Sequence, residues 1–159
     1  MKASVFYKIS AILLVLFAAG HTMGFRQTDP AWGVDTLIAM MKSMHFDAQG
    51  FSRSYWDFYV GFGLFVSILL VFAGLVAWQL GTLSDETLLT MPLLRWSLPV
   101  CFAIETLLNC KYFFIAPIAI SIVITVFLTL AAWLPVRSRA AASHPAKKPV
   151  LGASGSKAS

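Results

Sequence analysis

The stretch FYVGFGLFVSILLVFAGLVAWQL, Phe58–Leu80, runs for 23 residues without a charged side chain. An α-helix needs roughly 20 apolar residues to cross a hydrocarbon core about 30 Å thick. The stretch therefore predicts a membrane-spanning helix. It decides the fold because most of the 159-residue chain follows the same pattern.

Three further apolar runs surround this stretch: Ile9–Phe25, Leu93–Cys110 and Tyr112–Val136. Charged residues make up 12% of the chain, against roughly 25% in soluble domains. We expect an all-α protein, a four-helix transmembrane bundle formed by residues 1–136. Its spans are predicted at about 5–24, 55–80, 92–110 and 114–134, which leaves no room for a second folded domain.

The first apolar run has an alternative interpretation as a cleaved signal peptide. Lys2 and Lys8 would form its basic region, and Ala18-Ala19-Gly20 a small-residue cleavage site. The apolar run is long for that role, and cleavage would leave a protein with three spans. We expect the helix to be retained.

The long loop and the C-terminal tail have different compositions. In the loop, residues 26–54, Asp35 is a plausible N-cap for a short external helix at 36–45. Its methionines lie opposite Lys42, which predicts an amphipathic helix on the membrane surface or over the bundle. The tail, 137–159, is basic and poor in large apolar residues, and we expect it to be disordered.

The basic residues predict the orientation of the spans. Eight of them fall in the N-terminus, the 81–95 connection and the tail, and four fall in the 26–54 loop and the 110–112 turn. Because cytoplasmic segments carry the excess of Lys and Arg, both termini are predicted to be cytoplasmic. Aromatic residues mark the same two boundaries: Tyr7, Trp78, Trp96 and Trp133 on the inner side, and Tyr55, Trp56 and Tyr112 on the outer side.

A polar stripe occurs in the third predicted helix, where Ser97, Cys101, Glu105 and Asn109 recur every four residues. A carboxylate that faces lipid in a span costs roughly 3 kcal/mol or more. The stripe is therefore predicted to face the interior of the bundle.

Glu105 and His21 both fall near the outer ends of their helices, so a polar pocket open to the outside is one hypothesis. In it, Glu105 and His21 form an acid–base or ligand-binding pair. The remaining candidate residues are Asp57, Asn109, Arg26 and Arg53. The alternative is a structural hydrogen-bond network that joins the helices.

Other chemistries lack support in the sequence. Cys101 and Cys110 lie about 13 Å apart on one helix, too far for a disulfide. Methionines near His45 are more typical of a packing surface than of a metal site, and we expect no metal and no cofactor. The net charge of +5 is interpreted as a topology signal, so the expected partners are membrane lipid, a second copy or another membrane protein, and not nucleic acid.

Three segments resemble an uncharacterised family of small bacterial four-span membrane proteins: His21–Phe25, Ser54–Phe58 and Tyr112–Pro117. The resemblance covers about residues 5–135. It implies a four-helix topology in the bacterial inner (plasma) membrane, and it carries no activity. A looser, architectural similarity to DoxX-type four-helix proteins implies a link to quinone redox partners.

These observations favour an integral membrane protein that acts as a binding, accessory or structural component. The first alternative is a small membrane enzyme, or a quinone-linked redox accessory, that acts on a lipid-soluble substrate through Glu105 and His21. The second is a carrier subunit that works only as an oligomer.

The predicted topology is tested with reporter fusions placed after Thr82 and after Ser138. Both reporters should give a cytoplasmic signal, because the basic segments lie on that side. An external signal after Ser138 would rule out four spans. A mature protein that lacks its first residues would rule out the retained first helix.

Overall fold

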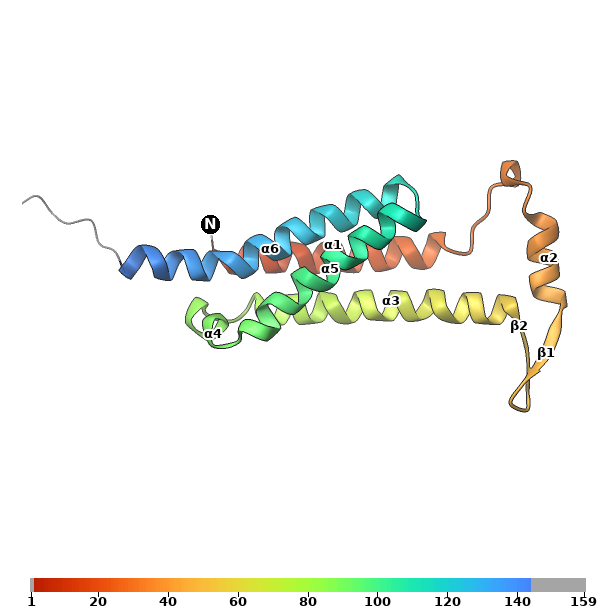
Figure 1. Ribbon diagram of the computed structural model, residues 1–159, viewed down its shortest axis with the longest axis horizontal. Coiled ribbons are helices and arrows are strands. Elements are labelled where there is room, and N and C mark those ends of the chain that lie inside the picture. The colour runs from red at the N-terminus through yellow and green to blue at the C-terminus, as the bar shows by residue number, and fades with distance from the viewer. Residues whose placement is uncertain (1, 144–159) are drawn as a thin grey trace, which may run out of the picture.

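The computed structural model describes residues 2–143 and is mostly helical (Figure 1). Its elements in chain order are α1 (Ala3–Gly24), the 3-10 turn η1 (Pro30–Trp32), α2 (Asp35–Ser43), β1 (His45–Ala48), β2 (Phe51–Ser54), α3 (Tyr55–Leu80), α4 (Asp85–Thr90), α5 (Pro92–Tyr112) and α6 (Ile115–Ser143). By length and composition, α1, α3, α5 and α6 are able to cross a membrane, which confirms the four predicted apolar helices.

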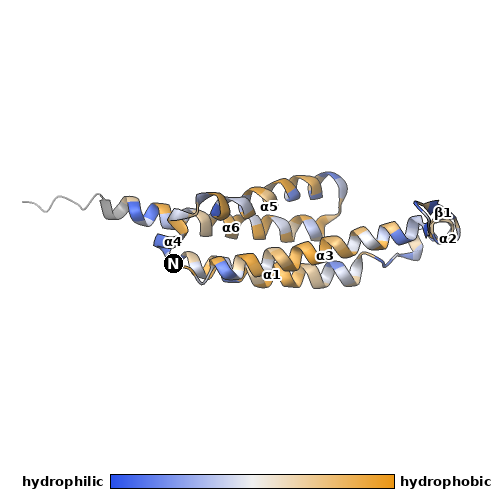
Figure 2. Ribbon diagram, turned by 90° about the horizontal axis from the view of Figure 1, so that it is seen from below, coloured by the Kyte–Doolittle hydropathy of each residue, from blue (hydrophilic) through white to orange (hydrophobic). Residues whose placement is uncertain are grey.

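The central helix of the bundle is α1. It packs against α3 on one side and α6 on the other, while α5 packs on α6 and has few contacts with α3. Figure 2 shows α1 and α3 in one layer and α5 and α6 in the other. We call the end that holds Ala3 and Pro92 the N-terminal end, and the end that holds α2 and the strands the loop end.

Small residues bring α1 and α3 into close contact. A Cβ added at Gly74 would lie 3.3 Å from the Ala11 carbonyl oxygen and 3.5 Å from the Leu14 Cβ. Nearer the N-terminal end, the Ser4 hydroxyl donates a hydrogen bond to the Gly81 carbonyl. The buried residues of α1 repeat at intervals of three and four, as one helical face requires: Ala3, Phe6, Tyr7, Ser10, Ala11, Leu14 and Ala18.

The buried part of α3 is its half toward the N-terminal end, from Ser67 to Leu80. Here α3 shares the core with α1 and with the fully buried Ile124 and Leu128 of α6. The other half of α3, from Tyr55 to Val66, exposes most of its large apolar side chains. The core is therefore concentrated toward one end of the α1–α3 pair, and the loop end of α3 is open.

Proline at position 99 shapes the contact between α1 and α5. Pro99 has no N–H, so the Arg95 carbonyl four residues earlier loses its helical donor. The Tyr7 hydroxyl of α1 lies 3.5 Å from this oxygen and donates to it. Pro99 thereby frees a carbonyl group of α5 to form a hydrogen bond with α1.

The C-terminal helix extends past the predicted boundary at residue 136, and its described part reaches Ser143. Arginine and alanine after Pro135 are strong helix formers, which explains the extension. The rest of the predicted tail, residues 144–159, lies outside the described residues.

The long loop contains a hairpin that the sequence analysis did not predict. The strands β1 and β2 pair antiparallel, with His45 opposite Ser54, and Gln49 and Gly50 form the turn with φ of 58° and 85°. The predicted helix at 36–45 is present as α2, which starts and ends slightly earlier. It runs across the axis of α3 (Figure 1). Its position on a membrane surface stays a prediction.

The close α1–α3 contact is tested by Gly74→Leu. The new side chain would meet the backbone of α1, which cannot rotate away, so we expect a loss of about 1–3 kcal/mol in the free energy of unfolding. Gly20→Leu is the control, because nothing lies within 4 Å of a Cβ added at Gly20. Equal unfolding midpoints for the two variants in detergent would contradict the packing.

Candidate functional site

His21 lies one turn before the end of α1 and pairs with α3. Its Nδ1 atom is 3.0 Å from the Ser67 hydroxyl. The Thr22 hydroxyl lies 2.7 Å from the same oxygen and 2.7 Å from the Ala18 carbonyl oxygen. We call His21, Thr22 and Ser67 the His21 cluster. Ser67 was missed in the sequence, although it is the only hydroxyl on an aliphatic side chain between Phe58 and Leu80.

Glu105 lies on α5, and its partner is Asn109 one turn further along the same helix. The Asn109 side-chain amide donates to Glu105 Oε1 at 3.0 Å. The other carboxyl oxygen, Oε2, is buried and has no hydrogen-bond partner among the described residues. The adjacent Thr106 hydroxyl lies 3.1 Å from the Thr125 hydroxyl, which joins α5 to α6.

The predicted polar stripe does not keep to one face of α5. Asn109 is buried, Glu105 and Ser97 are partly buried, and Cys101 is exposed. Residues four apart rotate by about 40° per step, so a stripe of four members turns through roughly a third of the helix. The buried face of α5 instead runs through Arg95, Pro99, Phe102 and Asn109, at steps of four, three and seven residues, and seven residues make about two helical turns.

Asp57 is a helix cap. Its carboxylate accepts hydrogen bonds from the Ser54 backbone N–H at 2.8 Å and from the Ser54 hydroxyl at 3.0 Å. The Ser54 hydroxyl in turn accepts from the Asp57 N–H, which completes a capping box at the start of α3. The Ser-x-x-Asp spacing is a known signature of this motif. Asp57 therefore has a structural role.

The two candidate arginines rest against neighbouring aromatic rings. The Arg26 guanidinium lies 5.3 Å from the centre of the Phe25 ring. The Arg53 guanidinium lies 5.3 Å from the Phe51 ring and donates to the Ser52 carbonyl at 2.8 Å. Neither arginine forms an ion pair with a carboxylate of the described residues.

The six predicted residues lie on different elements of the structure. His21 lies on α1, and Arg26 follows that helix. Glu105 and Asn109 lie on α5, Asp57 lies in the first turn of α3, and Arg53 lies on β2 just before α3. Within residues 2–143, no hydrogen bond or ion pair joins His21 to Glu105, and each has another partner. Their coupling stays a hypothesis.

Aromatic rings connect the His21 cluster to the loop end. The His21 ring stacks on Phe25 with 5.2 Å between centroids, and Phe25 contacts Tyr59 at 5.9 Å. Trp56 lies 5.4 Å from Tyr59, and Lys42 of α2 lies 4.6 Å from the Trp56 ring. The rings thus join α1, α3 and α2.

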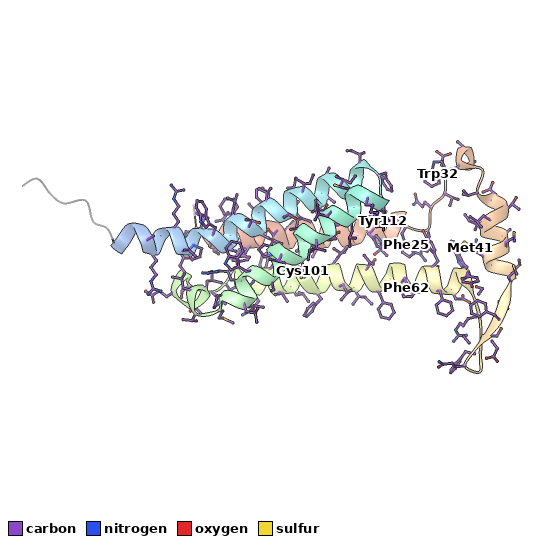
Figure 3. All side chains as sticks on the ribbon, in the orientation of Figure 1. Phe25, Trp32, Met41, Phe62, Cys101 and Tyr112 are labelled. Carbon is purple, nitrogen blue, oxygen red and sulfur yellow. The ribbon has the colours of Figure 1, made fainter. Side chains whose placement is uncertain are left out.

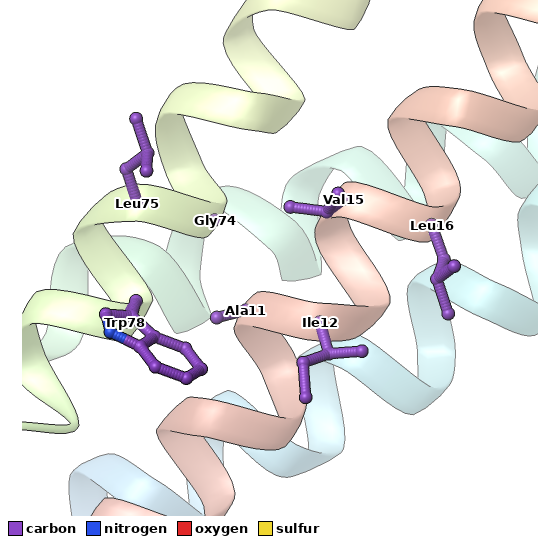
Figure 4. Close-up of a pocket in the computed structure, with 7 residues that line it drawn as sticks. All are labelled: Ala11, Ile12, Val15, Leu16, Gly74, Leu75 and Trp78. Atoms are coloured by element: carbon purple, nitrogen blue, oxygen red, sulfur yellow. The ribbon is translucent and has the colours of Figure 1, made fainter.

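Two shallow grooves lie on the surface of α3. The first runs along the contact between α1 and α3 and is lined by apolar side chains and Trp78 (Figure 4): Ala11, Ile12, Val15, Leu16, Gly74, Leu75 and Trp78. The second lies toward the loop end and is lined by Arg53, Asp57, Phe58, Gly61, Phe62 and Phe65. Neither contains His21 or Glu105.

Comparison of the chain with protein-family models, with curated proteins and with solved structures gave no match. In the described part of the chain, no three His, Cys, Asp or Glu side chains come together as a metal site would require. Cys101 and Cys110 are free and exposed. The site is therefore interpreted from its own geometry.

A double-mutant cycle tests the pairs that the structure defines. His21→Ala and Ser67→Ala should be coupled by about 0.6 kcal/mol and at most about 1.7, the range for hydrogen bonds between membrane helices. Unfolding in detergent is the measurement. His21→Ala combined with Glu105→Gln should be additive. Coupling in the second pair and additivity in the first would restore the single-pocket hypothesis.

Proposed function

We propose that this protein is a multi-pass component of the bacterial inner membrane, with both termini in the cytoplasm, that acts by associating with a second copy of itself. The orientation rests on the distribution of basic residues. The self-association rests on the outward face of α3.

Large apolar side chains form a regular stripe along α3. Phe58, Phe62, Phe65, Leu69 and Phe72 follow one another at steps of four and three, which is the spacing of a coiled-coil seam. They are between 41% and 66% exposed, and Phe62 points away from the bundle (Figure 3). We call these five residues the Phe stripe. It lies outside the buried face of α3, which runs through Ser67, Leu70, Gly74 and Ala77.

The second groove supplies a place for a side chain of another helix. Four of its residues, Phe58, Gly61, Phe62 and Phe65, stand at positions i, i+3, i+4 and i+7. Four residues with this spacing form the hole that receives a knob from a facing helix. Nothing lies within 4 Å of a Cβ added at Gly61, so the hole is open.

Charge favours a second copy as the occupant. All copies enter the membrane in one orientation, so a two-fold axis along the membrane normal places α3 parallel to α3 with the stripes facing each other. Arg53 and Asp57 lie at the same end of the groove. Each arginine would then lie near the aspartate of the opposite copy, where unlike charges attract.

The polar groups within the long helices favour a structural or binding role over catalysis. His21 pairs with Ser67, and Thr106 pairs with Thr125, so these side chains join helices to each other. One observation favours the alternative of a small membrane enzyme or quinone-linked accessory: the unpartnered Glu105 Oε2. A protonated carboxyl group there would be able to donate to a lipid-soluble substrate.

Self-association is tested with two leucines of similar exposure. Leu69 belongs to the Phe stripe and is 62% exposed, whereas Leu107 lies on α5 and is 70% exposed. Leu69→Ala should weaken dimerisation at least about fivefold, as the loss of roughly 1 kcal/mol of packing implies, and Leu107→Ala should not. Energy transfer between labelled copies in lipid vesicles measures the dissociation constant.

A second variant fills the hole at Gly61 with a side chain. Gly61→Leu should abolish dimerisation and leave unfolding of the monomer in detergent unchanged. A monomeric wild-type protein at high protein-to-lipid ratio would refute the proposal. A dimer equally sensitive to Leu69→Ala and Leu107→Ala would show that the interface lies elsewhere.

A further inference from the structure

Arg95 is a buried charged residue. It is the fourth residue of α5 and is 5% exposed, and among the buried polar side chains of residues 2–143 it alone carries a permanent charge. Its Nε and Nη1 atoms are buried and have no hydrogen-bond partner. No carboxylate in the described part of the chain forms an ion pair with it. An unpaired buried charge is strongly unfavourable, so a counter-ion is needed.

The start of α5 adds a second positive feature at the same place. Met91, the N-cap residue, provides no side-chain hydrogen bond, and the first turn contains no acidic residue. The amides of Leu93 and Leu94 precede the helical hydrogen-bond pattern and have no acceptor within the helix. The first turn of α5 and the arginine that follows it therefore both contribute positive charge, and no acidic side chain lies in that turn.

The acidic residues nearest to Arg95 in the sequence lie at the start of a different helix. Asp85 and Glu86 form the first turn of α4, which Ser84 caps through the Thr87 N–H. Both are exposed. The chain thus provides acidic residues at the start of α4 and none at the start of α5.

Neighbouring residues place Arg95 at a membrane boundary. Trp96 follows it, and the Lys8 ammonium lies 5.7 Å from the Trp78 ring at the same end of the bundle. Aromatic and basic residues of this kind mark the level of the lipid headgroups, where phosphate groups are concentrated.

We infer that Arg95 and the first turn of α5 form a binding site for a phosphate group at the N-terminal end of the bundle. Guanidinium groups bind phosphate through two parallel hydrogen bonds, and helix N-termini bind it through free amides. The short helix α4 packs against α5 and α6 at this end (Figure 1). The phosphate belongs to an anionic phospholipid or to a soluble phosphate compound.

The test compares Arg95→Met with Arg137→Met by thermal unfolding in a neutral detergent. Arg137 is the control, because it is an exposed arginine at the same end, 5.4 Å from the Trp133 ring. Phosphatidylglycerol is added in one arm, with phosphatidylcholine as its reference. Potassium phosphate is added in the other, with potassium chloride at equal ionic strength as its reference.

The thermal unfolding midpoints of wild type and Arg137→Met should rise by about 5–10 °C when the phosphate ligand is present at a hundredfold excess over its dissociation constant. Arg95→Met should gain nothing, and without phosphate its midpoint should equal or exceed that of wild type, because the unpaired charge is gone. Stabilisation by phosphatidylglycerol alone identifies a lipid headgroup, and stabilisation by potassium phosphate alone identifies a soluble compound.

Arg95→Lys provides an independent variant that keeps the positive charge but cannot form two parallel hydrogen bonds to a phosphate group. The rise in its unfolding midpoint with phosphate should be smaller than that of wild type. Absence of any gain in wild type, an undiminished gain in Arg95→Met or Arg95→Lys, or a loss of the gain in Arg137→Met would overturn the site.

Discussion

The contact between α1 and α3 is the interaction on which the rest of the bundle depends. Gly74 lets the backbone of α3 approach Ala11 closely, and in a membrane such packing replaces the hydrophobic effect as the force that joins helices. The other side of α1 holds α6, and α6 holds α5, whereas α3 and α5 have few contacts of their own. If α1 separated from α3, α3 would therefore keep only a few contacts with the other long helices.

The two ends of the molecule are built differently, and the proposed functions follow from that difference. Toward the N-terminal end, α1, α3 and α6 share a close-packed core, and the buried Arg95 is the group there that lacks a partner. Toward the loop end, aromatic rings hold α2 and the hairpin to α3. Because no other long helix covers that half of α3, Phe58, Phe62 and Phe65 of the Phe stripe are available there to another chain.

The four long helices were predictable because an apolar run of about 20 residues has one stable form in a membrane. Hydrogen-bond partners distant in sequence were not predictable, because no local pattern connects them. Ser67, for example, lies 46 residues from His21. Asp57 was predicted as a pocket residue, although its spacing to Ser54 is that of a capping box. The stripe through Glu105 was misread because steps of four drift around the helix, whereas buried faces alternate steps of three and four.

Disulfide trapping tests the central contact most directly. In a protein whose own two cysteines have been replaced, Leu14→Cys and Gly74→Cys place two Cβ atoms at about 3.5 Å, within the range of a disulfide. Oxidation in native membranes should rapidly cross-link these two positions within each chain. No cross-link should form when the exposed Leu16 replaces Leu14 as the partner of Gly74. Equal cross-linking of both pairs, or none of the first, would contradict the packing of α1 on α3.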